Sequence, residues 1–259
     1  MLYLLLGIAS LAATSTAAPV VADCDKTLLR SVTDSYVAAQ TDGKPGTLAP
    51  IADNLEYFEN DKKADITKGV LSQPQKIDNK RSQHDTTNCA TYTELIITDS
   101  KHPYVLGTQI HLAGGKVSKV ETIITDKGDW LFDAKGTLKW AQQEKWDPIP
   151  ADKRDTREAI KAAGDAYCDI FKDKTVKVPW GQPCARLEGG SYTGKGQASD
   201  RCDVGIPDNV QLTNRRYVID EEYGTVGIFL SFQGIPDSHE FRLEGGKLRY
   251  VHTLTATGR

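Results

Sequence analysis

The stretch that decides the fold is LEGGKLRYVHTLT, Leu243–Thr255, because LAGGKVSKVETII at Leu112–Ile124 repeats its pattern. Both stretches have Leu, Gly-Gly, Lys, Val and Thr at the same positions, and 131 residues separate Leu112 from Leu243. The same offset relates TDSYVAAQ in the first half to GDAYCDIF in the second. Two separated segments that keep one offset indicate an internal duplication.

Each half of the duplication is predicted to be a helix followed by an antiparallel sheet. Apolar residues recur at helical spacing in TLLRSVTDSYVAAQ and again in AIKAAGDAYCDIF. Strand-like runs follow each helix, and both halves contain the Gly-Gly-Lys hairpin. Helices on one face of a bent sheet enclose a cone with an apolar interior. The sequence therefore predicts an α+β fold with two tandem cone-shaped domains, packed as an internal pseudo-dimer.

The ends of the predicted domains follow from composition. Residues 1–22 carry no charge, include an apolar run and offer small residues for cleavage, which is typical of a signal peptide. An uncleaved membrane anchor is the alternative, although the apolar run is short for a span. The proline-containing connection QQEKWDPIPADKRD separates the halves. We expect domains at 23–145 and 146–259, in a secreted or lumenal protein with no membrane span after cleavage.

The five cysteines predict two disulfides. In an oxidising compartment cysteines pair where geometry allows, and five leave one over. Two lie in the first half and three in the second, so the simplest pairing is Cys24–Cys89 and Cys184–Cys202. Cys168 lies in a helical pattern with no adjacent basic residue, and we expect it to be a buried, inert thiol.

Several functional classes are excluded by the residues present. The formal net charge is −3 and basic residues form no stripe, which argues against nucleic acid. The five histidines lack metal-type spacing, so no metal is expected. The segment GGSYTGKG almost fits a phosphate-binding loop, but Gly196 replaces the magnesium-binding hydroxyl. We therefore expect neither a nucleotide nor another cofactor.

Two segments of the first half contain candidate acid–base groups. His84 and Asp85 adjoin in SQHDTTNC, where a carboxylate beside an imidazole can act as a general base. The alternative is a turn in which Asp85 accepts backbone N–H bonds. In KGDWLFD, Trp130 could desolvate the Asp129 carboxylate and raise its pKa. A tight Gly-Asp turn anchored by a buried Trp is the equal alternative.

The densest group of candidates is VPWGQPCARLEGG. Trp180 offers an apolar surface, Arg186 a planar fork for a carboxylate or anhydride oxygen, and Glu188 a possible base. Arg186 and Glu188 are two residues apart, so on a strand they share a face. The alternative is a structural ion pair between them, or with Arg215 or Arg216.

Seven segments of the chain carry a resemblance to known proteins: SYVAAQ, YFEN, CATYTELI, GDW, VPWGQPCARLEGG, RRYVID and RLEGGKLRYVHT. By these segments the chain resembles a group of secreted fungal proteins whose halves are similar to the ketosteroid-isomerase-like, or nuclear-transport-factor-like, cone. The resemblance covers nearly all of the chain after the signal peptide. Ketosteroid-isomerase-like proteins of this kind also occur in fungal pathways to maleidrides, where they are implicated in dimerising maleic anhydride units.

This resemblance implies a cofactor-independent isomerase or cyclase that acts on a small acid or a maleic-anhydride-like intermediate through a base-generated enolate. Partner proteins of a biosynthetic pathway are a further implication. The alternative is a non-catalytic secreted protein that binds a small ligand or a cell-surface partner. For the enzyme, the candidate acid–base residues are Glu188, Asp129, Asp85 and His84, and the candidate substrate-binding residues are Arg186, Arg216, Trp180 and Trp130.

Overall fold

The computed structural model of the protein describes residues 24–258. The predicted signal peptide, residues 1–22, lies outside this range. In the described part of the chain, no helix is long and apolar enough to cross a membrane.

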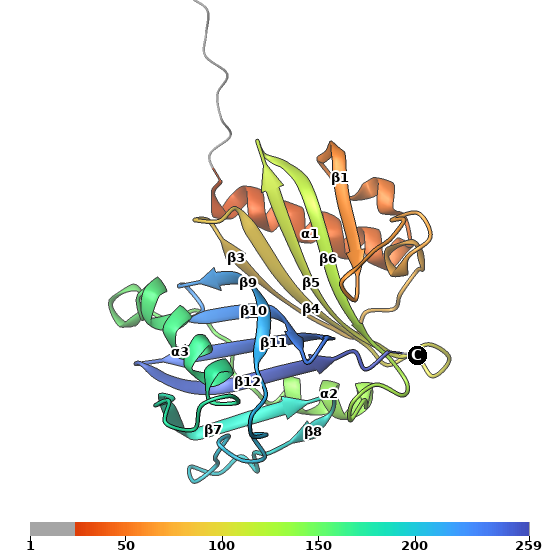
Figure 1. Ribbon diagram of the computed structural model, residues 1–259. Coiled ribbons are helices and arrows are strands. Elements are labelled where there is room, and N and C mark those ends of the chain that lie inside the picture. Colours follow the sequence, from red (N-terminus) through yellow and green to blue (C-terminus); the bar gives the residue numbers. More distant parts are fainter. Residues whose placement is uncertain (1–23, 259) are drawn as a thin grey trace, which may run out of the picture.

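The first half is a helix followed by a six-stranded sheet in the order β2-β1-β6-β5-β4-β3 (Figure 1). β1 and β6 are parallel, while the other neighbours in the sheet are antiparallel. Its elements are α1 (Lys26–Asp42), η1 (Pro45–Thr47), β1 (Ile51–Glu59), β2 (Lys62–Lys63), η2 (Val70–Ser72), β3 (Asn79–Asp85), β4 (Ala90–Ile97), β5 (Tyr104–Ala113) and β6 (Lys116–Thr125).

The second half repeats this arrangement, with the strand order β8-β7-β12-β11-β10-β9. Its elements are α3 (Arg157–Asp169), β7 (Trp180–Glu188), β8 (Ser191–Tyr192), β9 (Leu212–Asp220), β10 (Thr225–Phe232), β11 (Ile235–Glu244) and β12 (Lys247–Thr255). The chain between the sheets contains α2 (Ala134–Ala141) and η3 (Ala151–Lys153). The equal strand orders confirm the predicted α+β fold with two tandem cones. The expected boundary after residue 145 falls between α2 and η3 and stays a prediction.

Both long helices begin where a polar side chain caps the first turn. Asp25 accepts a hydrogen bond from the backbone N–H of Leu28 at 2.7 Å, and Thr156 caps α3 in the same way. α1 ends at Gly43, whose φ of 64° is in the left-handed region that glycine adopts without strain. Local sequence therefore fixes the ends of the helices that cover the two sheets.

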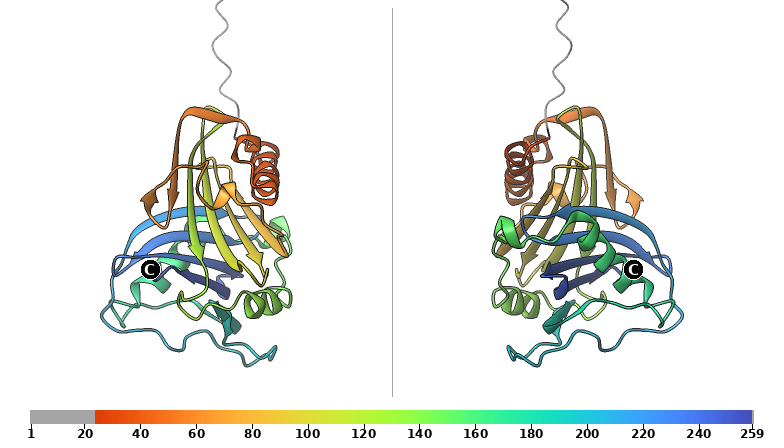
Figure 2. Two further views of the ribbon diagram at one scale, coloured as in Figure 1. Left: turned by 90° about the vertical axis from the view of Figure 1, so that its right-hand side faces the viewer. Right: turned by 90° about the vertical axis from the view of Figure 1, so that its left-hand side faces the viewer.

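Three apolar cores hold the molecule together. One lies between α1 and the first sheet, and a second lies between α3 and the second sheet. The third lies between the sheets and includes Tyr92, Val218, Phe229 and Leu254. Figure 2 shows the two curved sheets crossing, with α1 and α3 on their outer sides. Each sheet thus has a helix on one face and the other sheet against its other face, as expected for a pseudo-dimer.

The predicted disulfides are confirmed. Cys24 bridges to Cys89, and Cys184 bridges to Cys202. Cys168 is free and buried, and burial raises the pKa of its thiol, so the thiol stays protonated and inert near neutral pH. Two disulfides fit an extracellular or secretory environment.

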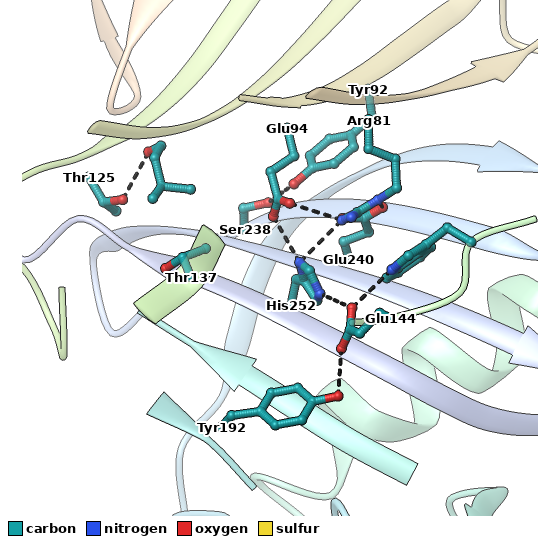
Figure 3. A network of polar contacts seen from close by, with 12 residues as sticks. Arg81, Tyr92, Glu94, Thr125, Thr137, Glu144, Tyr192, Ser238, Glu240 and His252 are labelled. Atoms are coloured by element: carbon teal, nitrogen blue, oxygen red, sulfur yellow. Dashed lines mark hydrogen bonds and ion pairs between the residues drawn. The ribbon is translucent and has the colours of Figure 1, made fainter. Parts of the chain in front are cut away.

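A buried network of charges joins the two sheets (Figure 3). Arg81 of β3 ion-pairs with Glu94 of β4 at 3.1 Å and with Glu240 of β11. His252 of β12 contacts Glu94 through Nδ1 at 2.9 Å and Glu144 through Nε2 at 2.5 Å. The ligand atoms of Glu94, Glu240 and His252 lie within 4.8 Å of one another, as in metal sites. The Arg81 guanidinium and the His252 imidazolium, however, already place two positive charges beside the carboxylates of Glu94 and Glu240.

The network predicts how stability changes with pH. Burial disfavours a charged His252, but the carboxylates of Glu144 and Glu94 outweigh it and raise its pKa from 6.5 to about 10. The folded state therefore binds this proton more tightly than the unfolded chain does. Its stabilising effect is complete below pH 6.5 and is lost as the pH rises towards 10.

We expect the free energy of unfolding in urea to fall over this alkaline range, and His252→Gln to flatten the fall. An equally steep fall in the variant would assign the effect to other groups.

Candidate functional site

The second cone contains a cavity of about 510 Å³, a volume typical of small-molecule sites. It lies between α3 and the concave face of the second sheet, and its wall is mainly apolar. The disulfide-linked segment between β8 and β9 closes one side. The apolar wall consists of Tyr167, Phe171, Pro207, Val210, Phe232 and Ile235.

The strand register brings five polar side chains together on the floor of this cavity. Glu188 of β7 pairs with Thr253 of β12, which in turn pairs with His239 of β11. One step along the same face, Asp237 pairs with Thr255. Because alternate residues of a strand share a face, both rows point to the interior of the cone. All five line the cavity.

Asp237 and His239 form a buried acid–base pair. Oδ1 of Asp237 lies 3.1 Å from Nδ1 of His239, and the two residues are 1% and 2% exposed. Thr255 donates a hydrogen bond to Oδ2 of Asp237 at 3.2 Å. Burial raises the pKa of the Asp237 carboxyl, and His239 offsets only part of that shift. Burial thus favours the protonated form of this carboxyl more than in an exposed aspartate.

Arg186, Glu188 and Trp130 form a second group at the cavity. Nε of Arg186 lies 3.3 Å from Oε2 of Glu188, so the ion-pair alternative for these residues is what the structure has. The indole Nε1 of Trp130 donates to Oε1 of Glu188 at 2.9 Å. Trp130 comes from the loop after β6 in the first half, yet it lines the cavity of the second.

Four polar atoms in this cavity lack a well-aligned hydrogen bond to protein. They are Nε of Arg186, Oδ1 of Asp237, Nδ1 of His239 and Oγ1 of Thr253. Buried polar atoms are normally hydrogen-bonded, since leaving one unsatisfied costs about 1–3 kcal/mol. These atoms, gathered around one apolar cavity, make the cavity the candidate site for a small molecule that carries polar atoms.

The first cone is closed at the positions that correspond to Arg186 and Glu188. Tyr57 and Glu59 have the same register against β6 as Arg186 and Glu188 have against β12. The Tyr57 hydroxyl donates to Glu59 at 2.6 Å, and Glu59 also accepts the backbone N–H of Val70 in η2. The short helix η2 therefore packs into the first cone, and the Glu59 carboxylate is hydrogen-bonded to protein groups.

The first copy has no counterpart of the Asp237–His239 pair at the equivalent positions. The 131-residue offset aligns Asp237 with Leu106 and His239 with Thr108. The hydroxyls of Thr108 and Tyr36 share a hydrogen bond of 2.7 Å inside the first core. The duplicated positions thus lie in a packed core in one cone and on the polar floor of a mainly apolar cavity in the other.

Asp129 lies at the rim and holds the loop that carries Trp130. Its Oδ1 accepts from the Thr257 hydroxyl at 3.1 Å and from the backbone N–H of Gly258 at 3.3 Å. Its Oδ2 accepts from the backbone of Asp126 at 2.9 Å. Trp130 is 53% exposed, so it does not desolvate Asp129 in the manner expected from sequence. The alternative is correct in the turn, which Asp129 holds, but wrong in the buried Trp, because Trp130 is half exposed.

The remaining candidates lie away from the cavity. Asp85 forms an ion pair of 2.7 Å with Arg157 of the other half. It also accepts a hydrogen bond from the backbone N–H of Asn88, as expected if Asp85 stabilises a turn and is not a base. His84 is buried beside Thr33, and burial lowers its pKa to about 4 despite nearby Asp220.

Two further candidates serve packing and ion pairing. Trp180 packs edge-on against Tyr167, with ring centroids 5.6 Å apart. Arg216 ion-pairs with Asp61 at 2.6 Å and with Glu121 at 3.1 Å, on a different surface. The structure thus brings together Arg186, Glu188 and Trp130 and separates them from the other candidates.

Sequence reasoning missed Asp237 and His239. They stand two residues apart in a strand-like run, which places them on one face. The duplication held a signal for them, because an aspartate and a histidine replace a leucine and a threonine of the first copy. Polar substitutions at interior positions of one copy are the pattern that could have found this site.

The Cys184–Cys202 bridge supports the cavity wall, which leads to a prediction. Its loop spans 18 residues, against 65 for Cys24–Cys89. Replacing both cysteines of a pair by alanine is expected to cost about 3 kcal/mol for the short loop and about 4 kcal/mol for the long one.

Hydrogen exchange is the measurement that separates the two bridges. Residues 193–211 are expected to exchange faster only in the Cys184→Ala/Cys202→Ala variant, with Cys24→Ala/Cys89→Ala as the matched control. Unchanged protection of this segment from hydrogen exchange would show that the cavity wall keeps its structure without the Cys184–Cys202 disulfide.

Comparisons with known proteins give no activity for this chain. A family model described as a domain of unknown function (DUF8021) matches residues 153–255. An NTF-2 like protein of unknown function from Burkholderia xenovorans LB400 is 15% identical, with a TM-score of 0.31, over 46% of this chain and 94% of that one. An ntf2-like protein from Bacteroides fragilis NCTC 9343 is 9% identical, with a TM-score of 0.24, over 92% of this chain and 100% of that one. The chain matches none of the curated proteins.

Proposed function

We propose that the second cone is the active site of a cofactor-independent enzyme that moves a proton on a small, mostly apolar carbonyl compound. The observation that carries this proposal is the Asp237–His239 pair in an apolar cavity, next to two donors, Nε of Arg186 and Oγ1 of Thr253, that lack a well-aligned hydrogen bond to the described residues. Buried acid–base groups with shifted pKa values are typical of sites that transfer protons.

The reaction begins at the carbon next to a carbonyl group. The Asp237–His239 pair takes a proton from that carbon, and the C–H electron pair becomes an enolate whose charge rests on oxygen. Nε of Arg186 and the Thr253 hydroxyl donate hydrogen bonds to that oxygen, which stabilises the charge as it develops. Where a double bond is conjugated with the carbonyl, return of the proton to another carbon of the extended enolate gives an isomer. Attack of the enolate on a second molecule joins the two, and the resulting anion takes up the proton. Neither outcome changes the oxidation level of the system, so no redox cofactor takes part.

Glu188 holds the site together in this proposal. One of its oxygens accepts from Trp130 and the other lies against Arg186, so both are already engaged. These contacts fix the guanidinium and the indole at the cavity, and the proton transfer falls to the Asp237–His239 pair instead. Glu188, which the sequence suggested as a base, therefore positions Arg186 and Trp130 in this proposal.

The resemblance noted in the sequence supports a more specific form of the proposal. A maleic-anhydride-like intermediate of fungal secondary metabolism that carries an alkyl group has an acidic carbon attached to the ring double bond, where loss of a proton gives an extended enolate, and its size suits a cavity of about 510 Å³. Pathway partners and secretion belong to the same form of the proposal. Dimerisation would then follow from attack of the enolate on a second anhydride, with the proton returned to the product.

Proton exchange tests the activity without knowledge of the natural substrate. The ketone 2-acetylnaphthalene has exchangeable protons beside its carbonyl, and ¹H NMR in D₂O follows their replacement by deuterium. We expect the protein to accelerate this exchange over buffer alone. Binding of the ketone without acceleration would support the alternative function, a non-catalytic ligand-binding protein, which the unpartnered polar atoms of the cavity also favour.

A further inference from the structure

We infer that the cavity of the second cone selects an uncharged carbonyl compound over the corresponding free carboxylate. This inference rests on the proposed function, because it concerns the ligand of the same site. Of the two ligands expected from the sequence, a small acid and an anhydride, the inference selects the anhydride, because it is uncharged.

The charges that line the cavity cancel one another. Arg186 and Glu188 form one ion pair at 3.3 Å, and Asp237 and His239 form a second close pair at 3.1 Å. Whether the proton lies on Asp237 or on His239, that second pair lacks a net positive charge, since one carboxyl and one imidazole share it. Arg186 is the one arginine or lysine among the described lining residues.

An anionic ligand would find no compensating charge in this cavity. Arg186 is 8% exposed, so its charge is largely withdrawn from water and already compensated by Glu188. A carboxylate ligand would lose its own hydration and lie near the carboxyl groups of Glu188 and Asp237. Burying an ion without a counter-ion is among the costliest changes in a protein interior.

An uncharged carbonyl needs only hydrogen-bond donors and an apolar surface. Oγ1 of Thr253 has no hydrogen-bond partner among the described residues, and Nε of Arg186 has only its 3.3 Å ion-pair contact with Glu188, which is not a well-aligned hydrogen bond. The aromatic rings of Tyr167, Phe171 and Phe232 supply the apolar surface. Such a ligand satisfies the buried groups and brings no charge into the cavity.

Two probes of nearly equal shape test this selectivity. Titration calorimetry would compare 2-acetylnaphthalene with 2-naphthoate, which replaces the methyl ketone by a carboxylate. We expect wild-type protein to bind the ketone at least about tenfold more tightly, a difference of about 1.4 kcal/mol.

The variant Glu188→Gln tests whether the ion pair with Arg186 is the cause of this selectivity. Glutamine can still accept from Trp130, but it leaves the positive charge of Arg186 without its partner. We expect this variant to bind 2-naphthoate at least about tenfold more tightly than wild type does, with little change for the ketone. The matched control is Glu244→Gln. Arg242 and Glu244 belong to a second Arg-Leu-Glu segment and form an ion pair with an N–O distance of 2.6 Å, and neither residue lines the cavity. We expect this control to bind both probes as wild type does.

The outcomes separate this inference from the proposed function. Tighter binding of 2-naphthoate by wild type would overturn the inference and leave the site in place. An unchanged preference in Glu188→Gln, in protein shown by thermal unfolding to be folded, would also overturn it. Failure of the wild type to bind either probe would overturn the proposed site and the inference with it.

Discussion

Asp237→Asn is expected to slow the protein-catalysed exchange of the protons beside the carbonyl of 2-acetylnaphthalene by about 10²–10⁴-fold, the usual contribution of a general base. Asparagine keeps the size of the side chain and its contact with Thr255, but it cannot take up the proton. NMR exchange rates at saturating ketone measure the effect on turnover. Calorimetry on the same samples measures the affinity, which we expect to change little.

Two further variants define the result. Glu244→Gln, on the same strand but outside the cavity, is expected to exchange the ketone protons at the wild-type rate. His239→Gln is expected to slow exchange as Asp237→Asn does, because the two residues act as a pair at 3.1 Å. Wild-type exchange rates in both Asp237→Asn and His239→Gln would remove this pair from the mechanism.

Arg81→Met is expected to lower the free energy of unfolding by about 3–5 kcal/mol, because it leaves buried carboxylates without their counter-ion. The side chains of Glu94 and Glu240 are 1% and 0% exposed, and both pair with Arg81 between the sheets. Methionine retains much of the apolar stem, so the loss reports mainly on charge. Urea unfolding of the wild type and the variant measures it.

The control for this loss is an exposed pair. Arg201 forms a salt bridge with Asp203 on the surface, and its side chain is 67% exposed. We expect Arg201→Met to leave the unfolding curve unchanged within error. Adding Glu240→Gln to Arg81→Met is expected to recover part of the stability. If Arg81→Met unfolds as the wild type does, the buried network does not hold the sheets together.

The internal repeat made most of the fold predictable from sequence. One offset between two hairpins predicted two copies of the same sheet, and equal strand orders confirm them. The disulfides followed from the division of cysteines between the copies, since each pair lies within one half. Periodicity and turn residues suffice for such features because the interactions involved repeat within each half.

The site was only partly predictable, because its contacts join residues that are distant in sequence. Arg186 and Glu188 were found from their two-residue spacing, which needs only the strand. Trp130 reaches Glu188 across 58 residues and from the other half, and no local pattern encodes that contact. Asp85 was a candidate base beside His84, with a turn as the alternative, and neither interpretation revealed its partner Arg157, which is 72 residues away.

The measurement that tests the central claim most directly is a crystal structure of the protein with 2-acetylnaphthalene. The account predicts the ring system within the apolar wall of the second cone. It also predicts the carbonyl oxygen within hydrogen-bond distance of Nε of Arg186 or Oγ1 of Thr253, and the methyl carbon beside Asp237 and His239. A ketone bound only elsewhere, or a second cone closed by its own side chains as the first cone is, would contradict the claim.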